Sequence, residues 1–128
     1  MAVRSVSRVG QILVVDDERN IVRLLQAWLE REGHAVTTAF DGRDALERIK
    51  ASDFDLVLLD VMMPFMDGFE VLQNLRQDPR TAELPVIMLT AKTSDADVFR
   101  AYHLGVDMYL TKPIDPDELM RFVRTLLA

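Results

Sequence analysis

The chain has 128 residues, which suits one domain with a single core and requires no disulfide or structural metal. Hydrophobic residues make up 49% of it and charged residues 28%, which excludes a disordered chain, and no apolar run reaches the roughly 20 residues that span a bilayer. The net charge of -6 argues against direct binding to nucleic acid, and the absence of cysteine excludes disulfides, thiolate metal sites and cysteine nucleophiles.

The amino-terminal segment MAVRSVSRVG is mildly basic and lacks the apolar region of a signal peptide. We therefore expect residues 1–10 to form a flexible tail and residues 11–128 to form the domain. A cytoplasmic location is expected, and the lack of cysteine agrees with a reducing compartment.

From residue 11 onward, short apolar runs alternate with segments of helical periodicity, a pattern typical of βαβ units. The predicted strands cover residues 12–15, 35–39, 56–59, 86–89 and 108–110. The runs LVV, LVLL and VIML have no polar interruption, as in parallel strands that helices cover on both faces. The sequence therefore predicts an α/β fold with five parallel strands and five helices.

The predicted helices carry apolar stripes and recognisable ends. The first helix places its stripe at Ile21, Leu24, Leu25, Trp28 and Leu29, and the last at Leu119, Phe122, Val123 and Leu126. Gly33 and Gly105 are placed to end helices, whereas Ser94 and Asp115 are placed to begin them as N-caps.

Polar side chains follow four of the predicted strands, at the sheet edge where open parallel sheets bind ligands. The first strand ends in Asp16-Asp17-Glu18, the third in Asp60, the fourth in Thr90 and the fifth in Thr111-Lys112-Pro113. Crowded carboxylates favour a compensating cation, and Mg²⁺ prefers such oxygen ligands. An aspartate can also act as a nucleophile toward phosphorus, with a lysine and a hydroxyl contacting the phosphoryl oxygens.

Simpler interpretations exist for single residues. Asp16-Asp17 alone is typical of a helix cap, and Lys112 alone of a solvated surface lysine. Neither His34 nor His103 belongs to the strand-end cluster, so both are expected to be solvated. The side chains of Met62, Met63 and Met66 are expected to pack flexibly, and Gly68 is expected to permit the turn into the third helix, beside a capping Asp67.

Four segments, LVVDDE (13–18), LVLLDVMMPFMDG (56–68), IMLTA (87–91) and YLTKP (109–113), resemble the receiver domains of bacterial two-component response regulators. The resemblance covers residues 11–127. It implies the flavodoxin-like strand order 2-1-3-4-5 and a signalling switch rather than an enzyme, although the domain would catalyse its own phosphorylation and dephosphorylation. The implied partners are a sensor histidine kinase or phosphotransfer protein and an output domain or effector.

The resemblance also implies a role for each site residue. Asp60 would be the phosphoacceptor, and Mg²⁺ would be bound by Asp16, Asp17, Asp60 and the backbone carbonyl of Met62. Lys112, before a cis peptide bond to Pro113, and Thr90 would contact the phosphoryl group. Thr90 and Tyr109 would switch the surface of the fourth helix, fifth strand and fifth helix, where a homodimer is one allowed outcome, with candidate contacts at Arg100, Asp107, Tyr109 and Arg121.

One position departs from the family's pattern. Phe65 stands in the loop after Asp60, where the family often carries a small or polar residue. It is therefore expected either to be an exposed partner contact or to fold back onto the core.

Three other functions compete with this interpretation. A phosphatase of the haloacid-dehalogenase type would have its nucleophile after the first strand and a second aspartate two residues later, but Glu18 follows Asp16 at that spacing, and no cap domain is seen. A flavodoxin-like cofactor carrier fits the fold, yet the chain has no Gly-rich phosphate loop. The third alternative is an interaction module that works without phosphorylation.

Overall fold

The computed structural model describes residues 9–92 and 94–128, in which five strands and five helices alternate along the chain. The elements are, in order, β1 (Gln11–Val15), α1 (Arg19–Arg31), β2 (Ala35–Ala39), α2 (Gly42–Ala51), β3 (Leu56–Leu59), α3 (Gly68–Gln77), β4 (Val86–Thr90), α4 (Asp95–His103), β5 (Met108–Thr111) and α5 (Pro116–Leu127). The predicted strands are confirmed to within one residue at either end. Most of the segment assigned to a tail, residues 1–8, lies outside the described residues.

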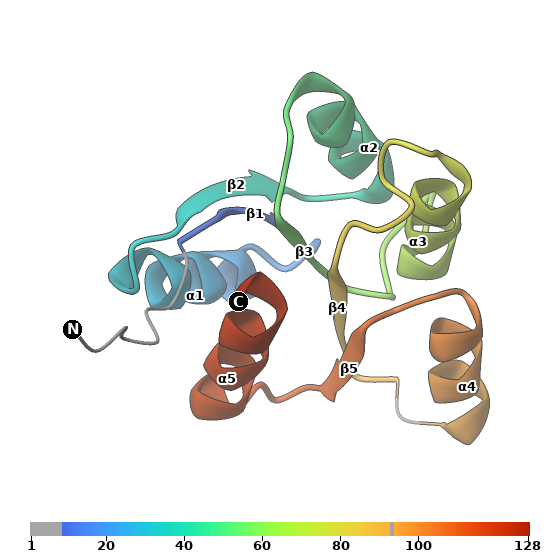
Figure 1. Ribbon diagram of the computed structural model, residues 1–128. Helices are drawn as coiled ribbons and strands as arrows, with labels where there is room; N and C mark the ends of the chain where they lie inside the picture. The colour runs from blue at the N-terminus through green and yellow to red at the C-terminus, as the bar shows by residue number, and fades with distance from the viewer. Residues whose placement is uncertain (1–8, 93) are drawn as a thin grey trace.

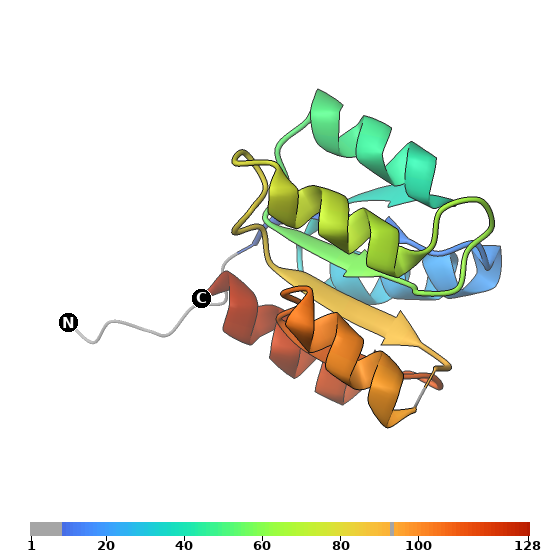
Figure 2. The same ribbon diagram turned by 90° about the vertical axis from the view of Figure 1, so that its right-hand side faces the viewer.

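All five strands are parallel, in the order β2-β1-β3-β4-β5 (Figure 1), which confirms the strand order implied by the resemblance. The register pairs Val15 with Leu59, so the residues that follow them, Asp16 and Asp60, leave neighbouring strands side by side. Figure 2 shows the strand arrows pointing toward the loop between β3 and α3, with the C-terminus at the opposite end of the sheet. The carboxyl edge of the sheet therefore collects the residues singled out in the sequence.

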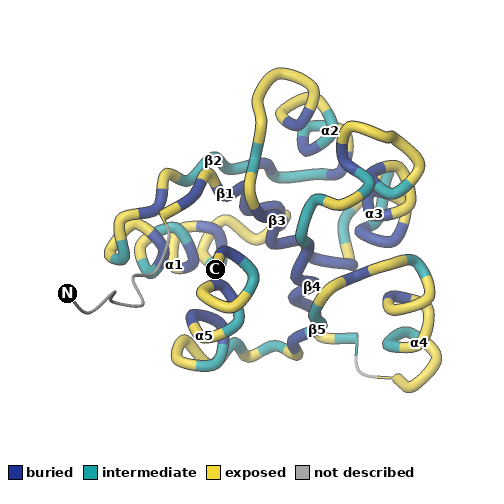
Figure 3. The backbone as a smooth tube through the Cα atoms, viewed as in Figure 1, coloured by how far each residue is buried: buried dark blue, intermediate teal, exposed yellow. Residues whose placement is uncertain are grey.

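Two layers of helices cover the sheet. The helices α1 and α5 lie on one face and α2, α3 and α4 on the other (Figures 1 and 2). Successive residues of β1 face opposite layers, because Leu13 packs with the α2–α3 side and Ile12 with the α1–α5 side. Figure 3 shows the central strands buried and the outer sides of the helices exposed. No described helix is long and apolar enough to span a bilayer.

The buried stripe of α1 differs from the predicted one. Val22, Leu25 and Leu29 are buried, whereas Leu24 is 45% exposed, so the placement of Leu24 in the stripe was wrong. Four of the five positions from 21 to 25 are apolar, and the periodicity therefore does not fix how the helix is rotated. Packing against the α1–α5 side of the sheet fixes it, and it leaves Leu24 on the outer side.

The helix ends follow the sequence signals. Gly33 and Gly105 have φ angles of 93° and 98°, in the left-handed region that ends helices and that glycine enters without a Cβ penalty. The Ser94 hydroxyl accepts the N–H of Asp97 at 3.1 Å, and the Asp115 carboxylate accepts that of Asp117 at 2.9 Å. These contacts confirm the two predicted N-caps.

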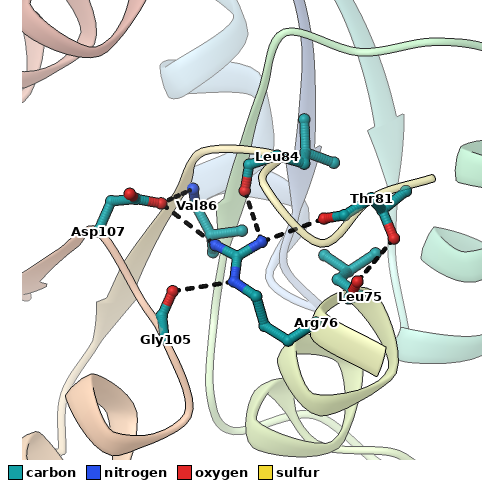
Figure 4. A network of polar contacts seen from close by, with 7 residues as sticks. All are labelled: Leu75, Arg76, Thr81, Leu84, Val86, Gly105 and Asp107. Atoms are coloured by element: carbon teal, nitrogen blue, oxygen red, sulfur yellow. Dashed lines mark hydrogen bonds and ion pairs between the residues drawn. The ribbon is translucent and has the colours of Figure 1, made fainter. Parts of the chain in front are cut away.

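The half-buried guanidinium of Arg76 makes polar contacts at the opposite edge of the sheet (Figure 4). Arg76 of α3 donates to the backbone oxygens of Thr81, Leu84 and Gly105 at 3.2, 2.7 and 3.0 Å. It also pairs with Asp107 at 3.2 Å, and the same Asp107 oxygen accepts the N–H that begins β4 at 2.8 Å. This network therefore ties the end of α3 to the segments that precede β4 and β5.

The expectation that His34 is solvated was wrong. Its ring is 5% exposed, and Nδ1 accepts the backbone N–H of Gly10 at 3.1 Å. That bond places the ring proton on Nε2, which has no hydrogen-bond partner among the described residues. Burial lowers the pKa of His34. His103 is exposed, as predicted, and stacks on Phe99.

Candidate functional site

Four carboxylates gather at the carboxyl edge of the sheet. Asp16, Asp17 and Glu18 follow β1 and Asp60 follows β3, and one oxygen from each lies within 4.8 Å of the others. Asp16 and Asp60 are buried, whereas Asp17 and Glu18 are exposed to solvent. The structure thus brings together the acids that strand-end reasoning singled out, with two of them held in the protein interior.

Lys112 is the cation of this cluster. Its ammonium donates to Asp16 at 2.8 Å and to Glu18 at 3.2 Å, and it lies 3.6 Å from an oxygen of Asp60. The Lys112–Pro113 peptide bond is cis, as expected. Burial alone would lower the pKa of Lys112, but the bond to Asp16 and the charge of Asp60 raise it above its ordinary value, so the ammonium is charged.

Burial makes the ionised form of Asp16 and of Asp60 less favourable. Burial, followed by the charge of Asp16, raises the pKa of Asp60 from 3.8 to about 6, against the opposing charge of Lys112 and the N–H of Met62. Burial also raises the pKa of Asp16, although Lys112 and the Glu18 N–H oppose it. One lysine therefore does not fully compensate the cluster. An all-oxygen donor set with excess negative charge fits a hard divalent cation such as Mg²⁺.

The backbone of Asp60 leaves no room for a side chain at position 68. A Cβ on Gly68 would overlap the carbonyl oxygen of Asp60 and would lie 2.8 Å from the Cα of Val61. The Gly68 N–H also donates to the Val61 carbonyl at 2.8 Å. Gly68 does not have a positive φ, so the turn into α3 needs glycine here for this close approach and not for a left-handed backbone.

Thr90 and Tyr109 contact the same backbone segment. The Thr90 hydroxyl oxygen accepts the N–H of Lys92 at 3.1 Å, and the Tyr109 hydroxyl donates to the Lys92 carbonyl at 2.6 Å. Burial, with smaller contributions from Asp97 and Asp60, raises the pKa of Tyr109 to about 12. Thr90, at the end of β4, is fully buried. Both residues are therefore connected to the loop that leads into α4.

The loop between β3 and α3 exposes two large apolar side chains. Phe65 is 95% exposed and Met62 is 54% exposed, whereas Met63 and Met66 pack against the core. The expectation of packing was therefore wrong for Met62, and the alternative in which Phe65 folds back onto the core is excluded. Asp67 caps α3 by accepting the Glu70 N–H at 2.9 Å, as expected.

Two features of the site had no specific role in the sequence-based prediction. Glu18 pairs with Lys112, and its place in LVVDDE was the only available signal, since it adjoins the two aspartates. The backbone of Lys92 joins Thr90 to Tyr109. Backbone groups are common to all residues, so no side-chain pattern could have revealed this contact.

Residues 12–124 match the family model described as "Response regulator receiver domain". The chain is 47% identical over 117 residues to the alkaline phosphatase synthesis transcriptional regulatory protein PhoP of Bacillus subtilis and 44% identical to the transcriptional regulatory protein ResD of the same organism; each alignment covers 91% of this chain and 48% of the relative.

The chain thus spans about half the length of these curated relatives. Among solved structures, the chemotaxis protein CheY4 of Vibrio cholerae superimposes with a TM-score of 0.88 at 32% identity, covering 94% of this chain and 100% of that one. Fold, motif order and sequence identity agree, and the chain belongs to the response regulator receiver domain family of two-component signalling systems.

Proposed function

We propose that Asp60 accepts a phosphoryl group from a phosphohistidine of a sensor kinase, in a reaction that depends on Mg²⁺. The observation that carries the proposal is the set of four carboxylates within 4.8 Å, with the ammonium of Lys112 among them. Asp60 is one of the two buried members and follows β3, the middle strand of the sheet, and the edge it occupies is where open α/β sheets bind ligands.

In the proposed reaction, a carboxylate oxygen of Asp60 forms a bond to phosphorus while the bond from phosphorus to the histidine nitrogen breaks. The imidazole leaves with that electron pair and takes up a proton from solvent. The attacking carboxylate must be ionised, and a pKa of about 6 leaves Asp60 mostly ionised at pH 7. Phosphoryl transfer then needs chiefly positioning and charge stabilisation, which the surrounding residues are placed to supply.

Asp16, Asp17, Asp60 and the Met62 carbonyl would hold the ion in this proposal. Bound Mg²⁺ would neutralise the excess carboxylate charge and stabilise the negative charge of the phosphoryl oxygens. Lys112 now lies nearer to Asp16 than to Asp60. Once the charge of Asp16 is compensated, the ammonium is free to turn toward a phosphoryl oxygen.

Thr90 and Tyr109 would transmit the effect of phosphorylation from Asp60 to the surface made by α4, β5 and α5. The Thr90 hydroxyl accepts the Lys92 N–H and keeps its own proton available for a phosphoryl oxygen. A shift of Thr90 would disturb Lys92, whose carbonyl holds the Tyr109 hydroxyl. Phosphorylation would thereby bias the surface made by α4, β5 and α5 between two arrangements.

That surface would contact an output domain, an effector or a second copy of the chain. The relatives PhoP and ResD are named transcriptional regulatory proteins and are about twice as long, which supports an output domain in the same polypeptide. The net charge of -6 supports protein contacts and not direct DNA binding by this domain. Arg100 and Arg121 lie over aromatic rings, and Asp107 is held by Arg76, so a dimer contact through these residues would compete with internal ones.

The test is phosphorylation by a small donor. The wild-type chain and Asp60→Asn are each incubated with phosphoramidate in the presence of either Mg²⁺ or a chelator. The intact mass of the protein in each sample is then measured by mass spectrometry. We expect one added phosphoryl group on the wild type with Mg²⁺ and none in the other samples. Equal labelling of Asp60→Asn, or labelling unaffected by the chelator, would contradict the proposal.

A further inference from the structure

Phe65 occupies a backbone conformation that is unfavourable for an aromatic residue. Its φ is 69°, and it is the one non-glycine residue with positive φ in the described part of the chain. The Met66 N–H donates to the Pro64 carbonyl at 2.8 Å, which closes a three-residue turn around Phe65. Turns of this hand are rare and strained for residues with a Cβ, whereas glycine enters them freely.

Burial against the described residues does not compensate this strain. The Phe65 side chain is 95% exposed, so burial of the ring contributes almost nothing to folding. A glycine would relieve the backbone, and a polar residue would avoid exposing an aromatic ring to water. A strained residue that gives nothing to its own fold indicates a role outside the chain.

The position of the loop indicates which partner is involved. Met62 and Phe65 both belong to the loop between β3 and α3. Figure 2 shows that loop at the edge toward which the strands point. A hollow of about 390 Å³ adjoins Met62, between this loop and the start of α4, and is lined in part by Phe69, Lys92 and Arg100. Any protein that places a phosphorus atom on Asp60 must cover this edge, because Asp60 itself is buried.

We propose that Met62, Phe65 and the adjoining hollow, here called the Met62–Phe65 surface, dock the histidine-containing domain of the phosphodonor. This inference rests on the proposed function of Asp60 and names the surface that positions the donor. The donor would present an apolar contact beside its phosphohistidine, which Phe65 would cover. Phe65 is a docking residue here and takes no part in the bond changes at phosphorus.

Three substitutions at position 65 distinguish the effect of the aromatic ring from the effect of the strained backbone. Phe65→Ala removes the ring and keeps the strained Cβ, Phe65→Gly removes both, and Phe65→Leu keeps an apolar side chain. Val9→Ala is the matched control, because Val9 is also an exposed apolar residue but precedes β1 at the opposite edge of the sheet. Each variant is tested with two donors, phosphoramidate and a radiolabelled sensor-kinase histidine domain chosen from a panel for its transfer to the wild type.

We expect Phe65→Ala and Phe65→Gly to lower kcat/KM for the kinase domain about tenfold, mainly through KM, as for an aromatic anchor at an interface. Phe65→Leu should retain most of the rate, and Val9→Ala should match the wild type. With phosphoramidate, all four variants should react within about twofold of the wild type, because a small donor needs no docking surface. In urea unfolding, Phe65→Gly should have a higher midpoint than Phe65→Ala.

Several results would overturn the proposal. Unchanged transfer from the kinase domain in Phe65→Ala would remove Phe65 from the donor interface. An equal loss with both donors would show that Phe65 acts on the site itself. If the substitutions at Phe65 changed only the oligomeric state of the phosphorylated protein, the surface would be a contact between copies of the chain. Failure of the wild type to react with phosphoramidate would instead refute the function proposed for Asp60.

Discussion

Asp60→Asn should stabilise the metal-free protein at neutral pH. The folded protein raises the pKa of Asp60 from 3.8 to about 6, so the ionised carboxylate is less favourable in the folded chain than in the unfolded chain. Each pKa unit corresponds to about 1.4 kcal/mol, and the rise therefore costs about 3 kcal/mol once the group is ionised in both states. Asparagine has nearly the same shape and carries no charge, so this cost disappears.

The sign of the pH dependence follows from the same values. Near pH 3 the carboxyl is protonated in both states, and the two proteins should be about equally stable. Between about pH 4 and pH 6 the unfolded chain releases the Asp60 proton before the folded chain does, so wild-type stability falls relative to Asp60→Asn. Above about pH 6 the difference should level off near 3 kcal/mol.

The assay is urea unfolding in a chelator at several pH values, followed by the fluorescence of Trp28, the single tryptophan. His34 titrates in both proteins, so its effect cancels in the difference. Asp53→Asn, at an exposed acid, controls for the loss of one negative charge. Saturating Mg²⁺ should stabilise the wild type more than Asp60→Asn and narrow the gap. A gap that does not change with pH, or a less stable Asp60→Asn at pH 7, would refute the reasoning.

Two further substitutions test the supports of the site. Gly68→Ala should lower stability by about 1–3 kcal/mol and slow the reaction of Asp60 with phosphoramidate, because the new Cβ displaces the Asp60 backbone; normal stability and rate would contradict the close approach. Arg76→Ala should cost about 2–3 kcal/mol in urea unfolding, since carbonyl groups lose their donor, while the phosphoramidate reaction stays within about twofold of the wild type. A large loss of rate in Arg76→Ala at unchanged stability would instead couple this network to the site.

The sequence predicted most of the framework because the signals are local. Uninterrupted apolar runs such as LVLL specify buried parallel strands, and glycine or a capping side chain marks where helices end. Strand ends in a parallel sheet meet at one edge, so the meeting of Asp16 and Asp60 followed from the strand assignments. The same reasoning placed Lys112 at that edge, because Lys112 follows the fifth strand.

What the sequence did not predict depends on distant contacts. The buried ring of His34 accepts an N–H from Gly10, which lies 24 residues away in the sequence. The residues around a histidine do not predict such a distant partner. The sequence pattern does not decide whether Val22 or Leu24 is buried, because that choice depends on how α1 packs against the sheet. Met62 was assigned to packing because methionine often fills gaps, but its loop turns it toward solvent.

The central claim is that Asp60 itself carries the phosphoryl group. The most direct measurement is chemical mapping of the modified residue after reaction with phosphoramidate and Mg²⁺. Borohydride reduction converts an aspartyl phosphate to homoserine, which peptide mass spectrometry then locates. We expect homoserine at position 60 and at neither Asp16 nor Asp17. Homoserine at another aspartate, or an unreduced phosphoryl group on a hydroxyl side chain, would contradict it.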